Sequence, residues 1–167
     1  LSAAHPERFQ EKARRMAESE IALTVLPSTD LFLMGRHQDH SVMRGVTAVH
    51  KLCHEGVNCS LSTNNVLNPF TPFGDCSLIR MANLYANISQ VSVQDDIVEC
   101  YEMIPNRSPK LMRLNDYGLE VGKSADLVVL DCYDRATAIS ELVQPLWGFK
   151  RGRQTFTRQP AELHRPH

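Results

Sequence analysis

The sequence predicts an α/β fold with a parallel sheet, followed by a β-rich carboxyl-terminal part. Through residue 90, segments with helical apolar periodicity alternate with short, continuously apolar segments. This alternation is typical of parallel strands joined by right-handed helical crossovers. From residue 117 the pattern changes to short strand-like segments separated by turn residues. We therefore expect two parts, residues 1–116 and residues 117–167.

Two helix–strand units are expected first. A helix capped by Ser2, with Pro6 in its first turn, carries an apolar stripe of Phe9, Ala13, Met16 and Ala17. The run Ile21–Leu26, ended by Pro27, is typical of a strand buried on both faces. The following segments are predicted, in order, as a polar loop (Ser28–Met43), a helix (Arg44–Glu55), a strand (Val57–Ser62), a loop (Thr63–Gly74) and a helix (Asp75–Gln90).

Further short elements are expected in the second half. The first is a helix from Ser92 through Tyr101 with a capping box of Ser92 and Asp95, and the second is a short helix opened by Ser108-Pro109. A strand (Ala125–Asp131) and a helical turn (Thr137–Val143) follow. The last is a hairpin of Leu146–Lys150 and Gln154–Thr157 around Arg151-Gly152-Arg153.

The composition excludes several classes of protein. In 167 residues, 43% are hydrophobic, which excludes a disordered chain. The 18 basic and 19 acidic residues leave a net charge of −1, so we expect no nucleic-acid partner. The longest apolar runs, such as Leu127–Leu130, are far shorter than the roughly 20 residues of a membrane span, so we expect no membrane association.

The five cysteines are dispersed and form no C-x-x-C motif. An odd, scattered set indicates small buried thiols in a reducing compartment, neither a disulfide framework nor a zinc knuckle. We therefore expect a cytoplasmic protein.

The loop after the second predicted strand is the best candidate for chemistry. Thr63-Asn64-Asn65 follows the strand directly, and the Pro-stiffened, aromatic-rich segment Asn68–Asp75 comes next. Parallel α/β folds place their sites at the carboxyl ends of strands, so this loop is a candidate substrate-facing wall. Asn and Asn-Pro also initiate turns, so a purely structural turn stays open.

Metal ligation by histidine receives little support. His37 and His40 form an H-x-x-H pair around Asp39, but no second ligand pair stands at useful spacing. We expect both histidines to be solvated loop residues.

Three segments resemble the bacterial-type cytosine deaminase branch of the amidohydrolase superfamily, which also includes ring-amide hydrolases. Val57–Asp75 (VNCSLSTNNVLNPFTPFGD) resembles the last barrel strand and its loop, and Leu26–Val46 resembles the preceding strand and long loop. Tyr117–Leu130 is similar to the superfamily's tail motif. The resemblance runs from about residue 9 to residue 158. It implies the carboxyl-terminal portion of a (β/α)8 TIM-type barrel within residues 1–116, and a small β appendage in residues 117–167.

The resemblance also implies roles for three residues. Asn64 stands where the family has an Asp that ligates the metal and takes a proton from the attacking water. An amide is at most a weak metal ligand and is no general base. Asn65 matches a substrate-pocket residue that is often Asp, and Phe70 matches an aromatic residue that covers the substrate ring.

The activity implied is metal-assisted hydrolysis of a C–N bond on a pyrimidine or triazine-like ring. Full-length relatives use zinc or iron, and their small-molecule partner is a nitrogen heterocycle. The amino-terminal metal ligands of the family are not in this sequence, so we expect the chain alone to bind no metal and to be inactive. The open strand edges predict self-association or a missing amino-terminal part. The alternative is a diverged, non-catalytic relative that acts as a binding or interaction module.

Overall fold

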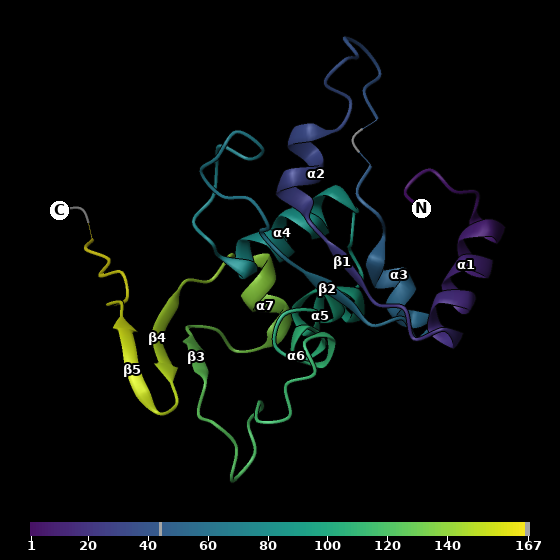
Figure 1. Ribbon diagram of the computed structural model, residues 1–167. Helices are drawn as coiled ribbons and strands as arrows, with labels where there is room; N and C mark the ends of the chain where they lie inside the picture. The colour runs from purple at the N-terminus through teal and green to yellow at the C-terminus, as the bar shows by residue number, and fades with distance from the viewer. Residues whose placement is uncertain (44, 166–167) are drawn as a thin grey trace.

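The computed structural model describes residues 1–43 and 45–165, and it contains two separate sheets (Figure 1). β1 (Leu23–Val25) and β2 (Cys59–Leu61) pair in parallel. β3 (Leu127–Leu130), β4 (Pro145–Lys150) and β5 (Arg153–Thr157) form an antiparallel sheet in that order. The predicted α/β class, with parallel strands first and a β-rich part afterwards, is confirmed.

The described part of the chain also contains seven helices. They are α1 (Pro6–Glu18), α2 (Pro27–Leu33), α3 (Val49–His54), α4 (Leu78–Ile88), α5 (Gln94–Glu102), α6 (Arg107–Leu111) and α7 (Arg135–Ser140). No helix within residues 1–43 and 45–165 has both the length and the apolar character needed to cross a membrane.

Local capping chemistry decides several helix starts. Ser77 Oγ accepts a hydrogen bond from the backbone N–H of Arg80 at 3.2 Å, so α4 begins after Ser77 and not at Asp75. Asp134 Oδ1 likewise accepts from the N–H of Thr137 at 2.7 Å, which starts α7 two residues earlier than predicted. The predicted caps Ser2 and Ser92 are wrong, because His5 and Val93 occupy the cap positions of α1 and α5.

Two predictions in the first half differ from the structure. The segment expected as a polar loop begins with helix α2, where Pro27 occupies the first turn and Asp30 lies near the positive helix end. The helix expected from Arg44 begins only at Val49, and Arg44 lies outside the described residues. Val46 is nevertheless buried in non-helical backbone, so its apolar character reflects the core and not helix periodicity.

The two faces of the parallel sheet are chemically different. Val25, Cys59 and Leu61 belong to the apolar core formed with the helices, and the partly buried Leu23 packs against it. The register pairs Thr24 with Ser60, whose hydroxyl oxygens are 2.8 Å apart. Because successive side chains alternate across a strand, this polar pair lies on the face opposite the core residues.

Helix α7 ties the carboxyl-terminal part to the helices of the first part. Ile139 is buried in the main core, and its carbonyl accepts a hydrogen bond from Asn83 Nδ2 of α4 at 2.8 Å. In Figure 1, α7 lies between the β3–β5 sheet and the β1–β2 pair. The boundary between residues 116 and 117 stays a prediction.

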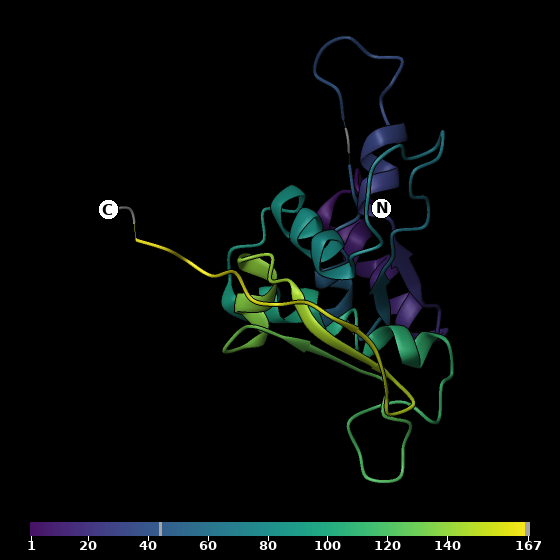
Figure 2. The same cartoon turned by 90° about the vertical axis from the view of Figure 1, so that its left-hand side faces the viewer.

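The predicted hairpin around residues 151–153 is confirmed. Arg151 and Gly152 both have positive φ, at 50° and 73°, as a two-residue hairpin turn with right-handed strand twist requires. Figure 2 shows the β3–β5 sheet from another side, with the carboxyl-terminal segment running away from it. Every residue of β5 is exposed.

Candidate functional site

Two loop regions meet at the carboxyl ends of the parallel strands. Helix α2 follows β1 directly, and residues 62–77 follow β2. Thr29 of α2 and Thr71 of the second region are both buried, and their hydroxyl oxygens are 2.9 Å apart. Both views place α2 and this second region at the same end of the molecule (Figures 1 and 2).

Asn64 is an exposed residue in the segment that follows β2. Its φ is +54°, a left-handed conformation that Asn tolerates better than most residues. Its N–H donates to Ser62 Oγ at 3.3 Å. This geometry also fits the turn interpretation, so the role of Asn64 in chemistry stays a prediction.

Asn68 organises the loop around the other two predicted residues. Its Nδ2 donates to Asn65 Oδ1 at 3.0 Å, and its Oδ1 accepts from the backbone N–H groups of Phe70 (3.0 Å) and Thr71 (3.2 Å). Asn65, Asn68 and Phe70 therefore belong to one hydrogen-bonded turn. The signal for Asn68 was available in the Asn-Pro pair, since Asn side chains commonly bond backbone two residues ahead.

Aromatic side chains from both loop regions lie at this end of the sheet. Phe70 and Phe73 are exposed at 59% and 65%, and Phe73 meets Phe32 of α2 edge to face, with ring centroids 6.1 Å apart. The Arg36 guanidinium lies 5.1 Å from the Phe32 ring centroid, a cation–π contact. The sequence predicted Phe70 but not Phe32, because the segment of Phe32 was expected to be a loop.

One acidic group near this wall has a perturbed pKa. Asp30 follows Thr29 on α2. Partial burial raises the pKa of its carboxyl, and a backbone hydrogen bond at Leu26 opposes this shift only in part.

The described side chains do not fit a catalytic metal ion. Within residues 1–43 and 45–165, no three His, Cys, Asp or Glu side chains gather as metal ligands would. His40 Nδ1 lies 2.6 Å from Asp39 Oδ1, and both side chains are almost fully exposed, as expected of a solvated loop. Asn64 offers only a neutral amide at the position that the resemblance assigns to a carboxylate.

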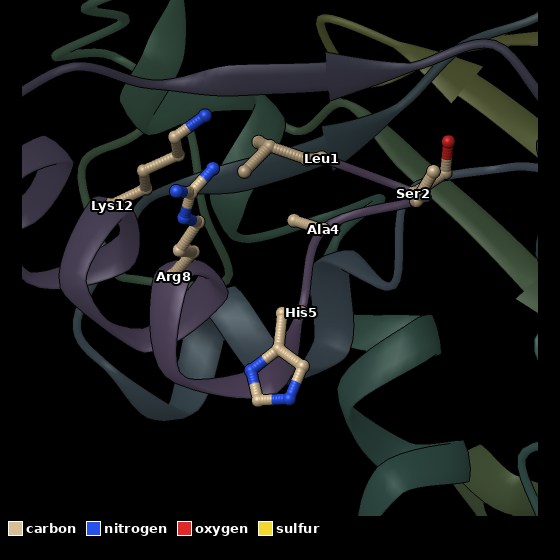
Figure 3. A pocket seen from close by; sticks show the side chains of 7 residues that line it. Leu1, Ser2, Ala4, His5, Arg8 and Lys12 are labelled. Atoms are coloured by element: carbon tan, nitrogen blue, oxygen red, sulfur yellow. The ribbon is translucent and has the colours of Figure 1, made fainter.

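Two hollows of the molecule lie away from Asn64, Asn65 and Phe70. One, of about 520 Å³, is lined by residues 1–5 with Arg8 and Lys12. Figure 3 shows the Arg8 and Lys12 side chains extending toward Leu1, with the His5 ring apart from them. Another, of about 800 Å³, lies between the α4–α5 region and the antiparallel sheet. The predicted site residues line neither hollow.

Residues 4–164 match the family model described as the amidohydrolase family, and the chain belongs to this family. Two curated relatives are similar in sequence. N-isopropylammelide isopropyl amidohydrolase of Pseudomonas sp. is 29% identical over 106 residues, which are 63% of this chain and 26% of that protein. Pterin deaminase of Rhizobium rhizogenes is 27% identical over 117 residues, 68% of this chain and 26% of that protein. The chain therefore spans about a quarter of the length of these relatives.

Solved structures of three proteins have a similar fold. The 5-methylcytosine deaminase of Klebsiella pneumoniae, liganded with 5-fluorocytosine, has a TM-score of 0.87 and 24% identity over 97% of this chain and 40% of that one. N-isopropylammelide isopropylaminohydrolase of Burkholderia multivorans has a TM-score of 0.75 and 20% identity over 92% and 36%. Atrazine chlorohydrolase of Arthrobacter aurescens, complexed with zinc, has a TM-score of 0.62 and 16% identity over 92% and 34%.

Proposed function

We propose that this chain forms the carboxyl-terminal part of a barrel-type amidohydrolase and supplies one wall of a site that hydrolyses a C–N bond on a nitrogen heterocycle. The observation that carries the proposal is the wall itself, in which the regions after β1 and β2 meet through Thr29 and Thr71 and display Phe70. Relatives named as deaminases and amidohydrolases of ring compounds support this substrate class.

The two parallel strands have the chemistry of barrel strands. Their apolar side chains face the helices, and Thr24 and Ser60 form a polar pair on the other face. Two strands cannot close a barrel of eight. We therefore propose that further strands continue this sheet, so that the open surface carrying Asn64, Asn65 and Phe70 becomes the floor or wall of an enclosed site.

Phe70 and Asn65 are proposed to hold the heterocycle. The exposed Phe70 ring offers a face for stacking on a flat ring. Because Asn65 Oδ1 already accepts from Asn68, its Nδ2 is the group left to donate to a ring carbonyl or nitrogen. A pyrimidine or triazine-like ring presents both the flat face and the acceptor edge.

We propose that the chain alone does not catalyse the hydrolysis. Attack of water on a ring carbon needs a base for the water proton, and the neutral amide of Asn64 takes up no proton. The metal ion that the resemblance implies, zinc or iron, is proposed to be held by residues outside this chain. The non-catalytic alternative rests on the same amide, and ammonia release by a complete barrel carrying Asn64→Asp separates it from the proposal.

Ring binding tests the proposed wall. Titrating 5-fluorocytosine with the chain and following the fluorine resonance by NMR is expected to show broadening that the Phe70→Ala variant abolishes. The matched control is Tyr133→Ala, which removes a fully exposed aromatic ring outside the wall and should leave the broadening unchanged. Equal broadening by wild type and Phe70→Ala would remove Phe70 from the site.

Ammonia release tests the proposed inactivity. We expect no release from cytosine by the purified chain with added zinc or iron, and none from its Asn64→Asp variant. Turnover above that of a mock purification from the same host would show that the chain alone is catalytic. If Asn64→Asp restores turnover in a complete barrel, the lost base explains the inactivity, whereas no gain favours the non-catalytic alternative.

The open strand edges are proposed to be covered, by a second copy or by a missing amino-terminal part. Unpaired strand edges promote association. Light scattering after size-exclusion chromatography is expected to show a mass above that of one chain. A well-behaved monomer with cooperative unfolding would contradict self-association.

A further inference from the structure

The two buried hydroxyls between α2 and the Phe70 loop belong to Thr29 and Thr71, which are not among the residues proposed to contact the heterocycle. Thr71 is 0% exposed and Thr29 is 6% exposed, although Phe70 beside them is 59% exposed. Burying a hydroxyl is unfavourable unless it is hydrogen-bonded, so both groups need partners. The buried pair of hydroxyls therefore connects α2 to the loop that carries Phe70.

Proton counting gives the direction of the connection. Thr71 Oγ1 donates its single proton to the carbonyl oxygen of Phe70, 2.8 Å away. The hydroxyl oxygens of Thr29 and Thr71 are 2.9 Å apart. Because the Thr71 proton is already used, the Thr29 hydroxyl is the donor in this contact. The carbonyl oxygen of Thr63, at 3.4 Å, is a weaker second acceptor for Thr29.

We propose that Thr29 and Thr71 are positioning residues that hold the peptide of Phe70, and with it the ring-contacting side chain, in register with α2. The relay runs from α2 through two hydroxyls to the carbonyl of the residue proposed to stack on the heterocycle. On its amide side Phe70 is held by Asn68 Oδ1 at 3.0 Å. Both sides of the Phe70 residue are therefore tied down, while its ring stays free for a ligand. The positioning role rests on the proposed function of Phe70.

Two matched pairs of variants separate the hydroxyl from the shape of the side chain. Thr71→Val and Thr29→Val keep the branched shape and remove the hydroxyl, whereas Thr71→Ser and Thr29→Ser keep the hydroxyl. If Thr71→Val does not fold, Thr29→Val tests the same relay from the helix side.

The first measurement is amide hydrogen exchange by NMR, which needs no ligand. Exchange at the Phe70 amide is expected to be about fivefold faster in each Val variant, the effect of losing one ordinary hydrogen bond, and within twofold of wild type in each Ser variant. Exchange at the Tyr85 amide, in the core of α4, should not change in any variant. Val variants that exchange as slowly as wild type, or Ser variants as fast as Val, would overturn the proposal.

The second measurement is the affinity for 5-fluorocytosine, followed by the fluorine resonance. The Val variants are expected to bind about fivefold more weakly and the Ser variants as wild type does. A loosened loop with unchanged affinity would overturn the positioning role. If wild type does not bind the ring, that result counts against the proposed function, while the exchange data still decide whether the two hydroxyls hold Phe70.

Discussion

At the residue scale, one buried polar contact lies in the core, apart from the candidate site. The side chains of His50 and Tyr85 are buried. The Tyr85 hydroxyl accepts from the backbone N–H of His50 at 3.1 Å and lies 2.7 Å from His50 Nδ1. A hydroxyl has one proton and two lone pairs, so the Tyr85 oxygen can donate to Nδ1 or accept from it, depending on the His50 tautomer. Burial lowers the pKa of His50, an effect that nearby Asp96 partly offsets, and burial also raises the pKa of Tyr85.

This contact predicts a dependence of stability on pH. The unfolded chain binds a proton at His50 near its ordinary pKa of 6.5, and the folded chain binds it only at lower pH. The unfolded state therefore holds more protons below pH 6.5, so the free energy of unfolding falls as pH is lowered from 7 to 5. Urea unfolding at a series of pH values measures the slope. His50→Gln should flatten it, and exposed His37→Gln should not. An unchanged slope in His50→Gln would assign the dependence to other groups.

At the element scale, the antiparallel hairpin depends on one glycine. The Phe156 ring of β5 lies over Gly148 of β4, and a Cβ added at Gly148 would come within 2.1 Å of Cε1 of that ring. No rotation of a methyl group relieves such a contact, so the ring or the strand must move. The sequence predicted both strands and their turn, but the cross-strand contact depends on the register, which only pairing decides.

Gly148→Ala is accordingly expected to destabilise the hairpin by about 1–3 kcal/mol, the range for overpacking. The chain's single tryptophan, Trp147, lies next to the substitution in β4, so its fluorescence during urea unfolding reports the change. The Phe156→Ala variant lacks the clashing ring, so adding Gly148→Ala to it should change the free energy of unfolding very little. A double variant in which Gly148→Ala still costs its full amount would show that the ring is not the cause.

At the scale of the whole molecule, α7 joins the carboxyl-terminal part to the helical core. Ile139 is 1% exposed and packs in the same apolar cluster as residues from α1, α3, α4 and α5. Asn83 Nδ2 adds a hydrogen bond to its carbonyl oxygen. We therefore expect the two sheets to unfold together, although no strand pairing joins them within residues 1–43 and 45–165.

Ile139→Ala is expected to lower the free energy of unfolding by about 2–5 kcal/mol, because it removes buried methylene groups and leaves a cavity. Far-ultraviolet circular dichroism and Trp147 fluorescence should shift by the same amount, since one probe follows the helices and the other the antiparallel sheet. The control Ile21→Ala removes the same atoms from a half-exposed position and should cost much less. A shift in fluorescence alone would show that the carboxyl-terminal part unfolds independently.

The sequence by itself determined the α/β class, the order of strands, the carboxyl-terminal hairpin and the membership of the amidohydrolase family. These properties depend on local apolar patterns, turn residues and contiguous motifs, which a sequence displays directly. It did not reveal α2, because Pro27-Ser28-Thr29-Asp30 favours a loop and a helix start equally well. Only the tertiary structure brought Thr29 to Thr71, 42 residues away, and Phe32 to Phe73. Such contacts between distant residues arise from packing and leave no periodic trace in either segment, so the wall that holds Phe70 became visible only in the folded chain.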